Sequence, residues 1–574
     1  MTSNNIYMGA AVRLTTLANG AVTNAASAEK LAKSAYDVPV RHQVAPGVTA
    51  LGGHGFLNLT LVEGPEGLVV FDTGERLEDG ELFLREIRAI SDKPIVAVIY
   101  SHSHYVFGTS VMLADTPDAL IIGHPLVNVN ITNGGSGNLY GETAPLQSSR
   151  TMQQFNYFAP ESGPNASAGA KINFGRSGFM PVNTPVQDGQ RMNVAGVEMQ
   201  FFTRHGSDTD DCLTVYLPET GVVMNNILWP FLPNIYTLRG AKFRDPREWR
   251  NALMVIRDLK PNAITGTHAR SIVGAAACRQ TLDDVIDGLN AILDQTLRGI
   301  LLGLGPDDLR SFVQLPAHLQ NVPCLAEIYG EISHFGPYLY NHALGWFDGD
   351  AATINPLPPL EQAERLVEAM GGRDAVLARA QAAFDTHEWA WAGQLVNYLF
   401  RIAPADAAVR ALKADVLEQH GRVTPGHTIR GWYIAQARAL RGEVRIPRLQ
   451  FANTRLLSLA APAESLAQYR IRIDPTRCAD MDWVVAIRIT DRAVRHGWHL
   501  RRGVVEFLPD PDADERQPKI ELATDYDNWL RFFSCKRDLA DFLGACLIPQ
   551  GSLAEATAFF AAFDYYAASD NILI

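Results

Sequence analysis

The stretch "IVAVIYSHSHYVFG", residues 95–108, decides the fold of the first half of the chain. Its apolar run is typical of a buried strand that ends at Tyr100, and His102 and His104 follow directly. Side chains at positions i and i+2 of an extended segment point the same way, so both imidazoles can reach one metal ion. The pattern therefore predicts a metal site at the end of a strand.

Strand-like runs surround this stretch and predict a layered α/β domain. "VTALGG", "FLNLTLVEG" and "GLVVFDTG" precede it, and Gly, Pro or Asp residues break them apart. The segment "LEDGELFLREIRAISD", residues 77–92, has helical spacing and ends before Pro94. Strands first, and then helix alternating with strand, indicate α/β layers.

Two downstream residues complete the expected ligand set. Asp208 lies in the polar turn "HGSDTDD", and His268 follows the apolar strand of "ITGTH". His102, His104 and Asp208 form a two-histidine, one-carboxylate set, while His268 either completes four-coordination or holds a water or substrate. These ligand types indicate one divalent metal ion, zinc in the first place and iron as the alternative.

Composition narrows the class of protein. The chain has 574 residues and a net charge of −12, which argues against nucleic acid as a partner. Its six cysteines are scattered without CxxC spacing, as expected of reduced thiols in the cytoplasm. No secretory signal and no apolar stretch of membrane-spanning length is recognised. We therefore expect a cytoplasmic protein without a membrane span that acts on a small molecule.

Shifts in composition predict four regions. The proline-rich joint "NPLPPLEQ" precedes a run of alanine-rich helices, and strand patterns return near residue 448. Residues 126–190 are rich in glycine and asparagine and form either a flexible insertion or a lid or binding loop. The predicted regions are an N-terminal arm (1–40), a catalytic domain (41–350) with a loop insertion (126–190), a helical domain (351–445) and a C-terminal α+β domain (446–574).

The helical region also predicts an assembly. Its amphipathic helices between residues 361 and 441 resemble an α-hairpin array, although no fixed repeat register emerges. They carry more apolar surface than a thin single layer of helices can bury. We therefore expect a homodimer built through this region.

The motifs together resemble a known family. "GFLNLTLVEGPEGLVVFDTG" followed by "YSHSH" is similar to the opening of the metallo-β-lactamase superfamily. "NIYTLRGAKFRDPREW", residues 234–249, and "GWFDGD", residues 345–350, resemble its alkyl sulfatase branch. The resemblance implies an αββα sandwich, an all-α helical-hairpin dimerisation domain and a sterol-carrier-like C-terminal α+β domain.

The chain departs from this family at the second of two metal positions. The family pattern has an Asp and a His after the H-x-H motif, where this chain has Val106 and Phe107. A glutamate that bridges the two metals in the family falls on Asn226, whereas the other metal-binding glutamate falls on Asp208. His268 matches the last histidine of the pattern. The resemblance therefore predicts an intact first metal position and a dismantled second one.

Arg239, in "TLRG", matches the arginine that grips sulfate in the family. A guanidinium holds an oxyanion through two parallel hydrogen bonds. The alternative interpretation is a structural ion pair with Asp211 or Asp245. The two interpretations predict opposite effects of substitution.

Four further side chains are candidates near these motifs. Tyr105 and Asn226 are candidate catalytic residues, as is Arg239. Trp229 and Tyr236 either line an apolar substrate slot with Arg239 or are core aromatic residues.

The sequence predicts a metal-dependent hydrolase with a single-metal site, acting on a small anionic or ester substrate that has an apolar part. Two alternatives stay open. One is non-hydrolytic chemistry at an iron site, such as an elimination or an oxygen-dependent reaction. The other is a catalytically retired protein that binds an anionic or lipid-like ligand. Retention of the whole first metal position favours an enzyme.

Overall fold

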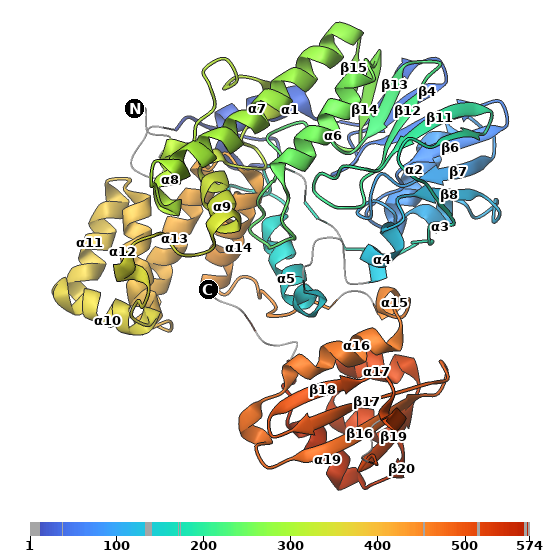
Figure 1. Cartoon of the computed structure of the whole chain (residues 1–574). Coiled ribbons are helices and arrows are strands. Elements are labelled where there is room, and N and C mark those ends of the chain that lie inside the picture. Colours follow the sequence, from blue (N-terminus) through green and yellow to red (C-terminus); the bar gives the residue numbers. More distant parts are fainter. Residues whose placement is uncertain are drawn as a thin grey trace. The chain divides into compact units, whose positions relative to one another are not determined.

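The computed structural model describes residues 12–36, 38–132, 140–169, 171–172, 174–451, 454–513, 517–566 and 571. The chain forms two compact units (Figure 1). The first contains Met1–Val127, Arg150–Ile446 and Leu573–Ile574, and the second contains Asn128–Ser149 and Pro447–Ile572. Part of the predicted insertion therefore groups with the C-terminal residues rather than with the sandwich that it interrupts.

Two sheets lie face to face in the first unit. Their shared core is built from alternate apolar side chains such as Val69, Ile99, Phe201 and Met224, all almost fully buried. The first sheet is ordered β3 (Val40–Ala45), β4 (Val48–Gly52), β5 (Leu59–Gly64), β6 (Gly67–Phe71), β7 (Ile95–Ile99), β8 (Leu120–Gly123), β9 (Thr184–Pro185). The second is ordered β10 (Arg191–Val194), β11 (Val197–Phe202), β12 (Thr214–Leu217), β13 (Val222–Asn225), β14 (Ala263–Gly266), β15 (Ile272–Val273).

Helices cover the outer faces of both sheets (Figure 1). The predicted helix after β6 forms as α2 (Leu77–Arg88), and α3 (Thr109–Met112) follows the H-x-H motif. On the second sheet lie α6 (Pro246–Asp258) and α7 (Ala275–Leu301). Asp245 caps α6 by accepting a hydrogen bond from the Arg247 amide, and Pro246 fits the first helical position.

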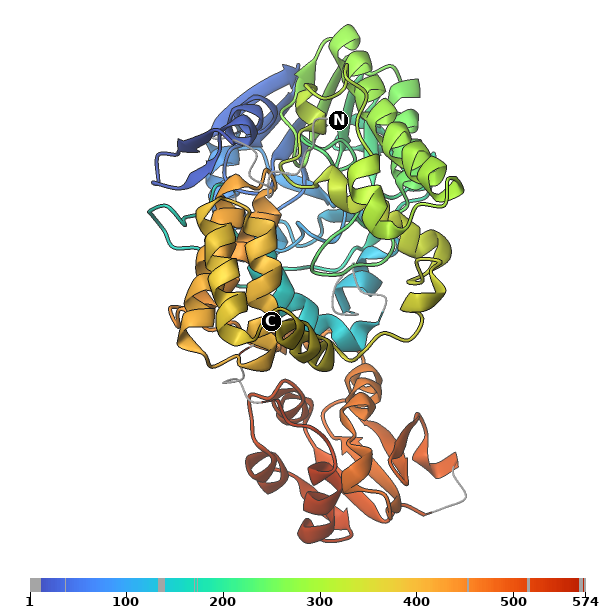
Figure 2. The same ribbon diagram turned by 90° about the vertical axis from the view of Figure 1, so that its left-hand side faces the viewer.

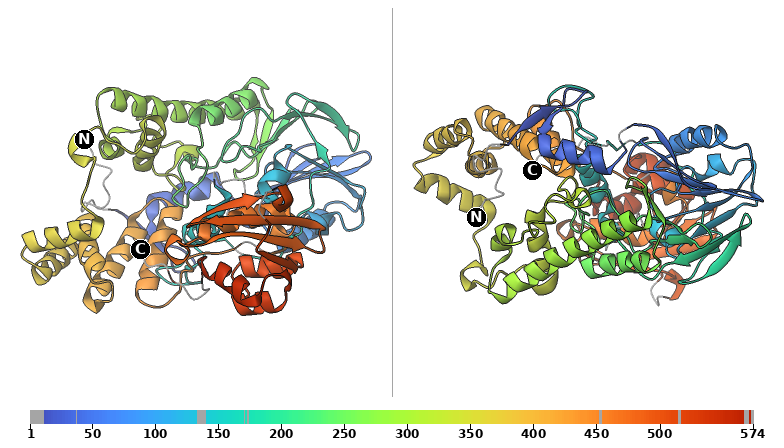
Figure 3. Two further views of the ribbon diagram at one scale, coloured as in Figure 1. Left: turned by 60° about the horizontal axis from the view of Figure 1, so that its bottom comes forward. Right: turned by 90° about the horizontal axis from the view of Figure 1, so that it is seen from above.

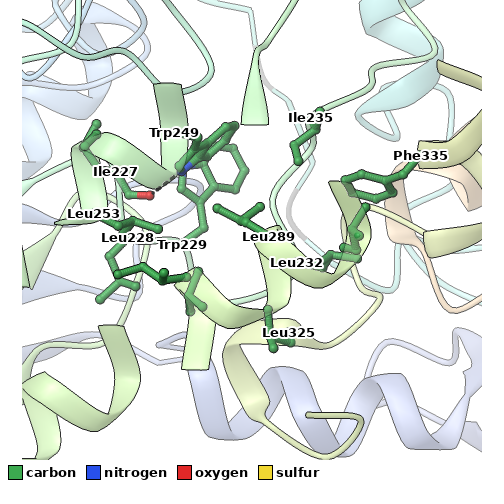
Figure 4. Close-up of a cluster of buried hydrophobic side chains, with 14 of the residues drawn as sticks. Ile227, Leu228, Trp229, Leu232, Ile235, Trp249, Leu253, Leu289, Leu325 and Phe335 are labelled. Carbon is green, nitrogen blue, oxygen red and sulfur yellow. Dashed lines mark hydrogen bonds between the residues drawn. The ribbon is translucent and has the colours of Figure 1, made fainter. Parts of the chain in front are cut away.

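A second apolar core lies beneath α6 and α7 (Figure 4). Trp249 of α6 is almost fully buried, and its indole nitrogen donates to the Ile227 carbonyl at 2.9 Å. This bond ties α6 to the segment that follows β13. The helices α8 (Pro306–Phe312) and α9 (Ile332–Leu344) pack into the same core.

The region predicted as an N-terminal arm, residues 1–40, contains regular secondary structure in its described part. Strands β1 (Leu14–Thr16) and β2 (Val22–Asn24) form an antiparallel hairpin, and α1 (Ala25–Ser34) follows it. Residues 1–11 and 37 lie outside the described part of the chain. Asn24 caps α1, and its side-chain nitrogen donates to the Val423 carbonyl at 3.0 Å.

The segment predicted as a loop insertion, residues 126–190, contains helices. They are α4 (Val127–Thr132), a 3-10 turn η1 (Gly141–Thr143) and α5 (Ala144–Gln154). Buried Gln154 accepts hydrogen bonds from the Arg239 amide at 3.0 Å and from the Thr237 hydroxyl at 3.1 Å. The end of α5 therefore positions the backbone of the candidate anion-binding arginine.

Antiparallel helix pairs make up the region after residue 355 (Figure 2). Their apolar faces pack on one another around Leu395, Val396 and Leu399. The helices are α10 (Pro359–Ala369), α11 (Arg373–Asp385), α12 (Trp389–Ile402), α13 (Ala407–Val423) and α14 (His427–Leu440).

The second unit has a five-stranded sheet with helices on one of its faces (Figure 3). Its order is β18 (Val504–Leu508), β17 (Val494–Arg501), β16 (Asp482–Ile489), β19 (Ile520–Thr524), β20 (Leu547–Gln550). Its helices are α15 (Thr454–Leu457), α16 (Pro462–Tyr469), α17 (Tyr526–Phe533), α18 (Leu539–Gly544) and α19 (Leu553–Ala561). The segment "YRIRIDP", residues 469–475, has a strand-like sequence, but it begins at the last residue of α16 and continues as the 3-10 turn η4 (Arg470–Arg472).

Within the described residues, no helix combines the length and the apolar character needed to cross a bilayer.

Candidate metal centre

The candidate ligands meet where strands of the two sheets end. Strands β6 and β7 are parallel, and β13 and β14 are parallel, so each pair ends at one edge of its sheet. His102 follows β7, His268 follows β14, and Asp208 lies between β11 and β12. The Leu213 amide donates to the Ser101 carbonyl at 2.7 Å, which fastens the second sheet to the H-x-H loop.

His102, His104 and Asp208 form the cluster that the sequence predicts. One ligand atom from each lies within 4.8 Å of the others, the only such group of three or more found within the described ranges. His102 Nε2 and His104 Nδ1 are 3.0 Å apart, and Asp208 Oδ2 is 3.3 Å from His104 Nδ1 and 3.9 Å from His102 Nε2. Ligands about 2 Å from a tetrahedral zinc ion are roughly 3.3 Å from each other. The spacing therefore fits one ion.

A buried hydrogen-bond chain orients His102. Its Nδ1 lies 2.8 Å from the Ser101 hydroxyl, while Asp72 accepts from the Ser101 amide at 2.9 Å and from the Thr267 hydroxyl at 2.8 Å. The backbone of Asp72 is left-handed, with a φ of 67°. Burial raises the pKa of its carboxyl to about 7. Such outer partners fix the ring orientation of a ligating histidine.

Burial and neighbouring groups also shift the pKa values of His102 and Asp208. It holds the pKa of His102 well below the ordinary value, so the imidazole is neutral and can ligate. Burial opposes the charge of Asp208, but the hydrogen bond to His104 and the nearby positive charge of Arg244 help to hold the pKa of that carboxyl well below its usual range. Neutral imidazoles beside a carboxylate are the forms that bind a metal cation.

His268 faces the cluster without joining it in this structure. Its Nδ1 lies 3.0 Å from the Phe56 carbonyl, which can only accept, so the proton of the neutral ring sits on Nδ1. The other nitrogen, Nε2, is buried and has no hydrogen-bond partner. The ring centre of His268 lies 6.4 Å from the ring centre of His102. This orphaned lone pair suits a metal or a bound water.

The positions that the sequence predicts as a dismantled second metal site hold two apolar side chains, Val106 and Phe107. Val106 is fully buried, and its backbone forms a bridge with Gly74. The ring of Phe107 lies 6.5 Å from Phe179. Neither side chain carries a ligating atom.

Asn226 lies beside the candidate metal ligand Asp208. Its amide nitrogen is 3.5 Å from Asp208 Oδ1 and 3.3 Å from Cys212 Sγ. Its Oδ1 is buried and has no partner. The geometry gives Asn226 a supporting contact to a metal ligand.

Arg239 is the basic group that the sequence places near the site. Burial and the nearby charge of Arg244 lower the pKa of Arg239 to about 10. Tyr329, Asp208 and Tyr105 act in the opposite direction and raise it. It therefore stays charged at neutral pH. Its buried Nε has no hydrogen-bond partner. No ion pair of Arg239 is found within the described part of the chain, and Asp245 is bound by Arg247 instead.

Several aromatic rings lie beside His268 and His102. Trp229 lies with its ring centre 4.4 Å from that of His268 and 5.1 Å from that of Tyr329, which stacks on Phe231 at 5.5 Å. Tyr105 lies 5.2 Å from His102 and 5.3 Å from His268.

Tyr236, the other predicted substrate-binding aromatic, is not brought to the cluster. The Tyr236 ring packs edge-on against the rings of His334 and Phe335. Its hydroxyl accepts a hydrogen bond from the Glu331 amide at 2.8 Å. The side chain is almost fully buried in the core beneath α6 and α7.

Three residues of the site were missed by sequence reasoning. Arg244 is buried, donates to the Asn234 carbonyl at 2.8 Å and acts electrostatically on Asp208. Tyr329 lies among Trp229, Arg239 and Arg244. Glu75 acts on both Tyr105 and Tyr329. Only Arg244 carried a signal, because it lies within the "NIYTLRGAKFRDPREW" segment.

Comparison with known proteins places the chain in a family. The model described as metallo-beta-lactamase superfamily matches residues 52–224, and the model described as alkyl sulfatase dimerisation matches residues 305–443. A linear primary-alkylsulfatase of a Pseudomonas strain is 31% identical over 467 residues, 78% of this chain and 88% of that relative. The chain belongs to the alkylsulfatase family of the metallo-β-lactamase superfamily.

Two other proteins agree with this assignment. An (R)-specific secondary-alkylsulfatase of Pseudomonas is 31% identical over 418 residues, 70% of this chain and 62% of the relative. The structure of the stereoselective inverting sec-alkylsulfatase Pisa1 from Pseudomonas is 24% identical, has a TM-score of 0.77 and covers 99% of this chain and 94% of that one. The predicted family and fold class are thus confirmed.

The family assignment sharpens two points. Metal binding belongs to the superfamily, and the cluster of His102, His104 and Asp208 is the candidate site within this alkylsulfatase-family chain. The dimerisation match begins at residue 305, ahead of the predicted domain boundary at 351, so α8 and α9 belong to the matched region.

Proposed function

We propose that this protein is a single-metal hydrolase of alkyl sulfate esters. The observation that carries the proposal is the two-histidine, one-carboxylate cluster near the half-buried Arg239, whose Nε is buried and has no hydrogen-bond partner. The alkylsulfatase relatives supply the substrate class. The replacement of ligands by Val106 and Phe107 supports one ion rather than two.

His102, His104 and Asp208 would hold the ion, and the free Nε2 of His268 would bind it or its water. A bound divalent ion, zinc in the first place and iron as the alternative, would supply a water of lowered pKa and a Lewis acid. Asn226 supports Asp208 through its amide.

Arg239 would bind the sulfate group. Its planar guanidinium matches two sulfate oxygens, and its position near Asp208 brings the anion next to the cluster. Trp229 and Tyr329 offer apolar ring faces for the alkyl part. The hydrogen bond from the Arg239 amide to the side chain of Gln154 in α5 holds this part of the backbone in place.

The test is an assay of the purified protein with a linear alkyl sulfate, combined with its metal content. We expect one equivalent of metal and release of inorganic sulfate, lost on chelation and restored by the metal. Two equivalents would overturn the single-metal assignment. A fully loaded protein that binds alkyl sulfate without cleaving it would favour the ligand-binding alternative.

We infer that the protein is a homodimer. The match to the dimerisation model supports this. Apolar side chains also gather on the surface within that match, where Leu344, Trp346 and Ile354 are 59%, 70% and 48% exposed and line one groove with Gly345 and Phe347. We propose a second copy of the chain as the occupant of this groove, whereas the sequence favoured residues 361–441.

Trp346→Asp is therefore expected to convert the dimer to monomer at micromolar concentration in sedimentation. A buried tryptophan at the centre of an interface contributes about 2 kcal/mol or more, and a charge there adds a desolvation cost. Trp391→Asp, at an exposed position of α12, is the matched control because Trp391 is 42% exposed. A dimer lost only in the Trp391 variant would move the interface to the helix pairs.

The cytoplasmic location remains a prediction.

A further inference from the structure

The two carboxylate oxygens of Asp208 have different surroundings. Oδ2 lies on the side of the histidines, 3.3 Å from His104 Nδ1 and 3.9 Å from His102 Nε2. Oδ1 lies among hydrogen-bond donors instead, because the Ser207 hydroxyl donates to it at 3.1 Å and the Asn226 amide nitrogen is 3.5 Å away. One oxygen is therefore left for a metal ion, while the protein itself engages the other.

A thiol holds the Asn226 amide beside this carboxylate. The Cys212 S–H donates to the Thr209 carbonyl at 3.2 Å, because a carbonyl can only accept. The sulfur is then left to accept from the Asn226 amide nitrogen, which lies 3.3 Å away. The reverse orientation of the amide would turn its oxygen toward the Asp208 carboxylate. The thiol therefore keeps the hydrogens of Asn226 on the side of Asp208 Oδ1.

The set is closed to solvent and has no basic partner. Ser207, Asp208, Cys212 and Asn226 are all buried, so water does not replace these donors. Among the residues that the structure describes, no lysine or arginine forms an ion pair with Asp208, and its neighbours on the Oδ2 side are the two ring nitrogens. A buried carboxylate without a basic partner needs another cation, which a metal ion supplies.

We propose that Ser207 and Asn226 are positioning residues that make Asp208 a one-oxygen ligand and so build a site for four-coordinate zinc. This inference rests on the metal site of the proposed function. With Oδ1 engaged, the cluster offers one oxygen and two ring nitrogens, and the orphaned Nε2 of His268 or a water completes four positions. Four such ligands suit zinc, whereas manganese takes six ligands that are mainly oxygen.

The residue type at position 226 agrees with this role. The family pattern has a metal-bridging glutamate there, and a second carboxylate beside Asp208 would repel it unless a cation lay between them. The amide of Asn226 donates instead of repelling. Its backbone is also held, because its carbonyl accepts from the Trp229 indole nitrogen at 3.0 Å. A ligand position of the family is thus a supporting position in this chain.

The test loads the full-length protein with Co²⁺, which replaces zinc and absorbs visible light far more strongly in four-coordinate than in six-coordinate sites. We expect the strong absorption in the wild type. Ser207→Ala frees Oδ1, so the carboxylate can bind through both oxygens, and the absorption should weaken. Ser103→Ala is the matched control, since its buried hydroxyl lies between the two ligand histidines but has no hydrogen-bond partner. Its spectrum should match that of the wild type.

Affinities for zinc and manganese give a second readout. Loss of an outer partner costs metal sites roughly ten- to a hundredfold in affinity, and we expect a loss of that size for Zn²⁺ in Ser207→Ala. The affinity for Mn²⁺ should not fall, because a carboxylate that binds through both oxygens suits this ion. Equal losses for both metals would show a merely structural role and would overturn the inference. Asn226→Ala should act in the same direction, and it decides the question if circular dichroism shows that Ser207→Ala does not fold.

Two spectra would also overturn the inference. One is a weak, six-coordinate cobalt spectrum of the wild type, which is the result expected of an iron-type site with open positions. The other is a folded Ser207→Ala protein whose cobalt spectrum equals that of the wild type. None of these measurements uses hydrolysis, so a protein that gives the expected spectra but cleaves no alkyl sulfate would contradict the proposed function and leave this inference standing. A wild type that binds no cobalt would contradict both.

Discussion

Asp208→Ala is expected to remove the metal ion, and with it the hydrolytic activity, from a protein that stays folded. Asp208 lies 3.3 Å from His104 Nδ1 and is the one ligand of the cluster whose metal-binding form carries a negative charge. Loss of outer partners alone costs metal sites roughly ten- to a hundredfold in affinity, so loss of a charged ligand should cost more than a hundredfold. His102→Ala should act in the same direction.

Metal analysis after dialysis, with circular dichroism of the same sample, measures this effect. Asp210→Ala is the matched control, because Asp210 lies in the same turn but is bound at the surface by Lys242 at 3.0 Å. It should keep its full equivalent of metal. Full metal retention by the Asp208 variant would contradict the assignment of the site.

The metal ligands were predictable because their signals are local. His102 and His104 need only the two-residue period of an extended chain, and each of His102 and His268 follows an apolar strand. Neighbouring parallel strands end at the same edge of a sheet. Residues that follow such strands are therefore close in space even when they are far apart in the sequence. Arg239 needed the motif of the family, since one arginine has no local signature.

The missed residues depend on contacts between distant segments. Tyr329 reaches the site from a stretch between α8 and α9, where its ring lies 5.1 Å from that of Trp229. The N-terminal hairpin escaped prediction for the same reason. Buried Arg430 donates to the Val22 carbonyl at 2.8 Å and to the Pro164 carbonyl at 2.9 Å, so a helix far along the chain orders it.

Arg239→Lys is expected to weaken the handling of alkyl sulfate while leaving stability nearly unchanged. Lysine keeps the charge but cannot present the planar pair of donors that matches two sulfate oxygens. A hydrogen bond to a charged group contributes about 1.5–3 kcal/mol, which corresponds to roughly ten- to a hundredfold in kcat/KM. Enzyme kinetics and a thermal melt of the same variant measure both quantities.

The structural interpretation of Arg239 predicts the reverse result, because a buried ion pair that loses its geometry lowers the melting temperature and spares turnover. The described structure removes its proposed partners. Asp245 is bound by Arg247, and Asp211 accepts from the Thr209 hydroxyl at 2.5 Å. Arg247→Lys, at an exposed ion pair, should change neither quantity and serves as the control. A destabilised Arg239→Lys protein with normal kcat/KM would remove this arginine from the active site, and with it the main residue-level reason for an anionic substrate.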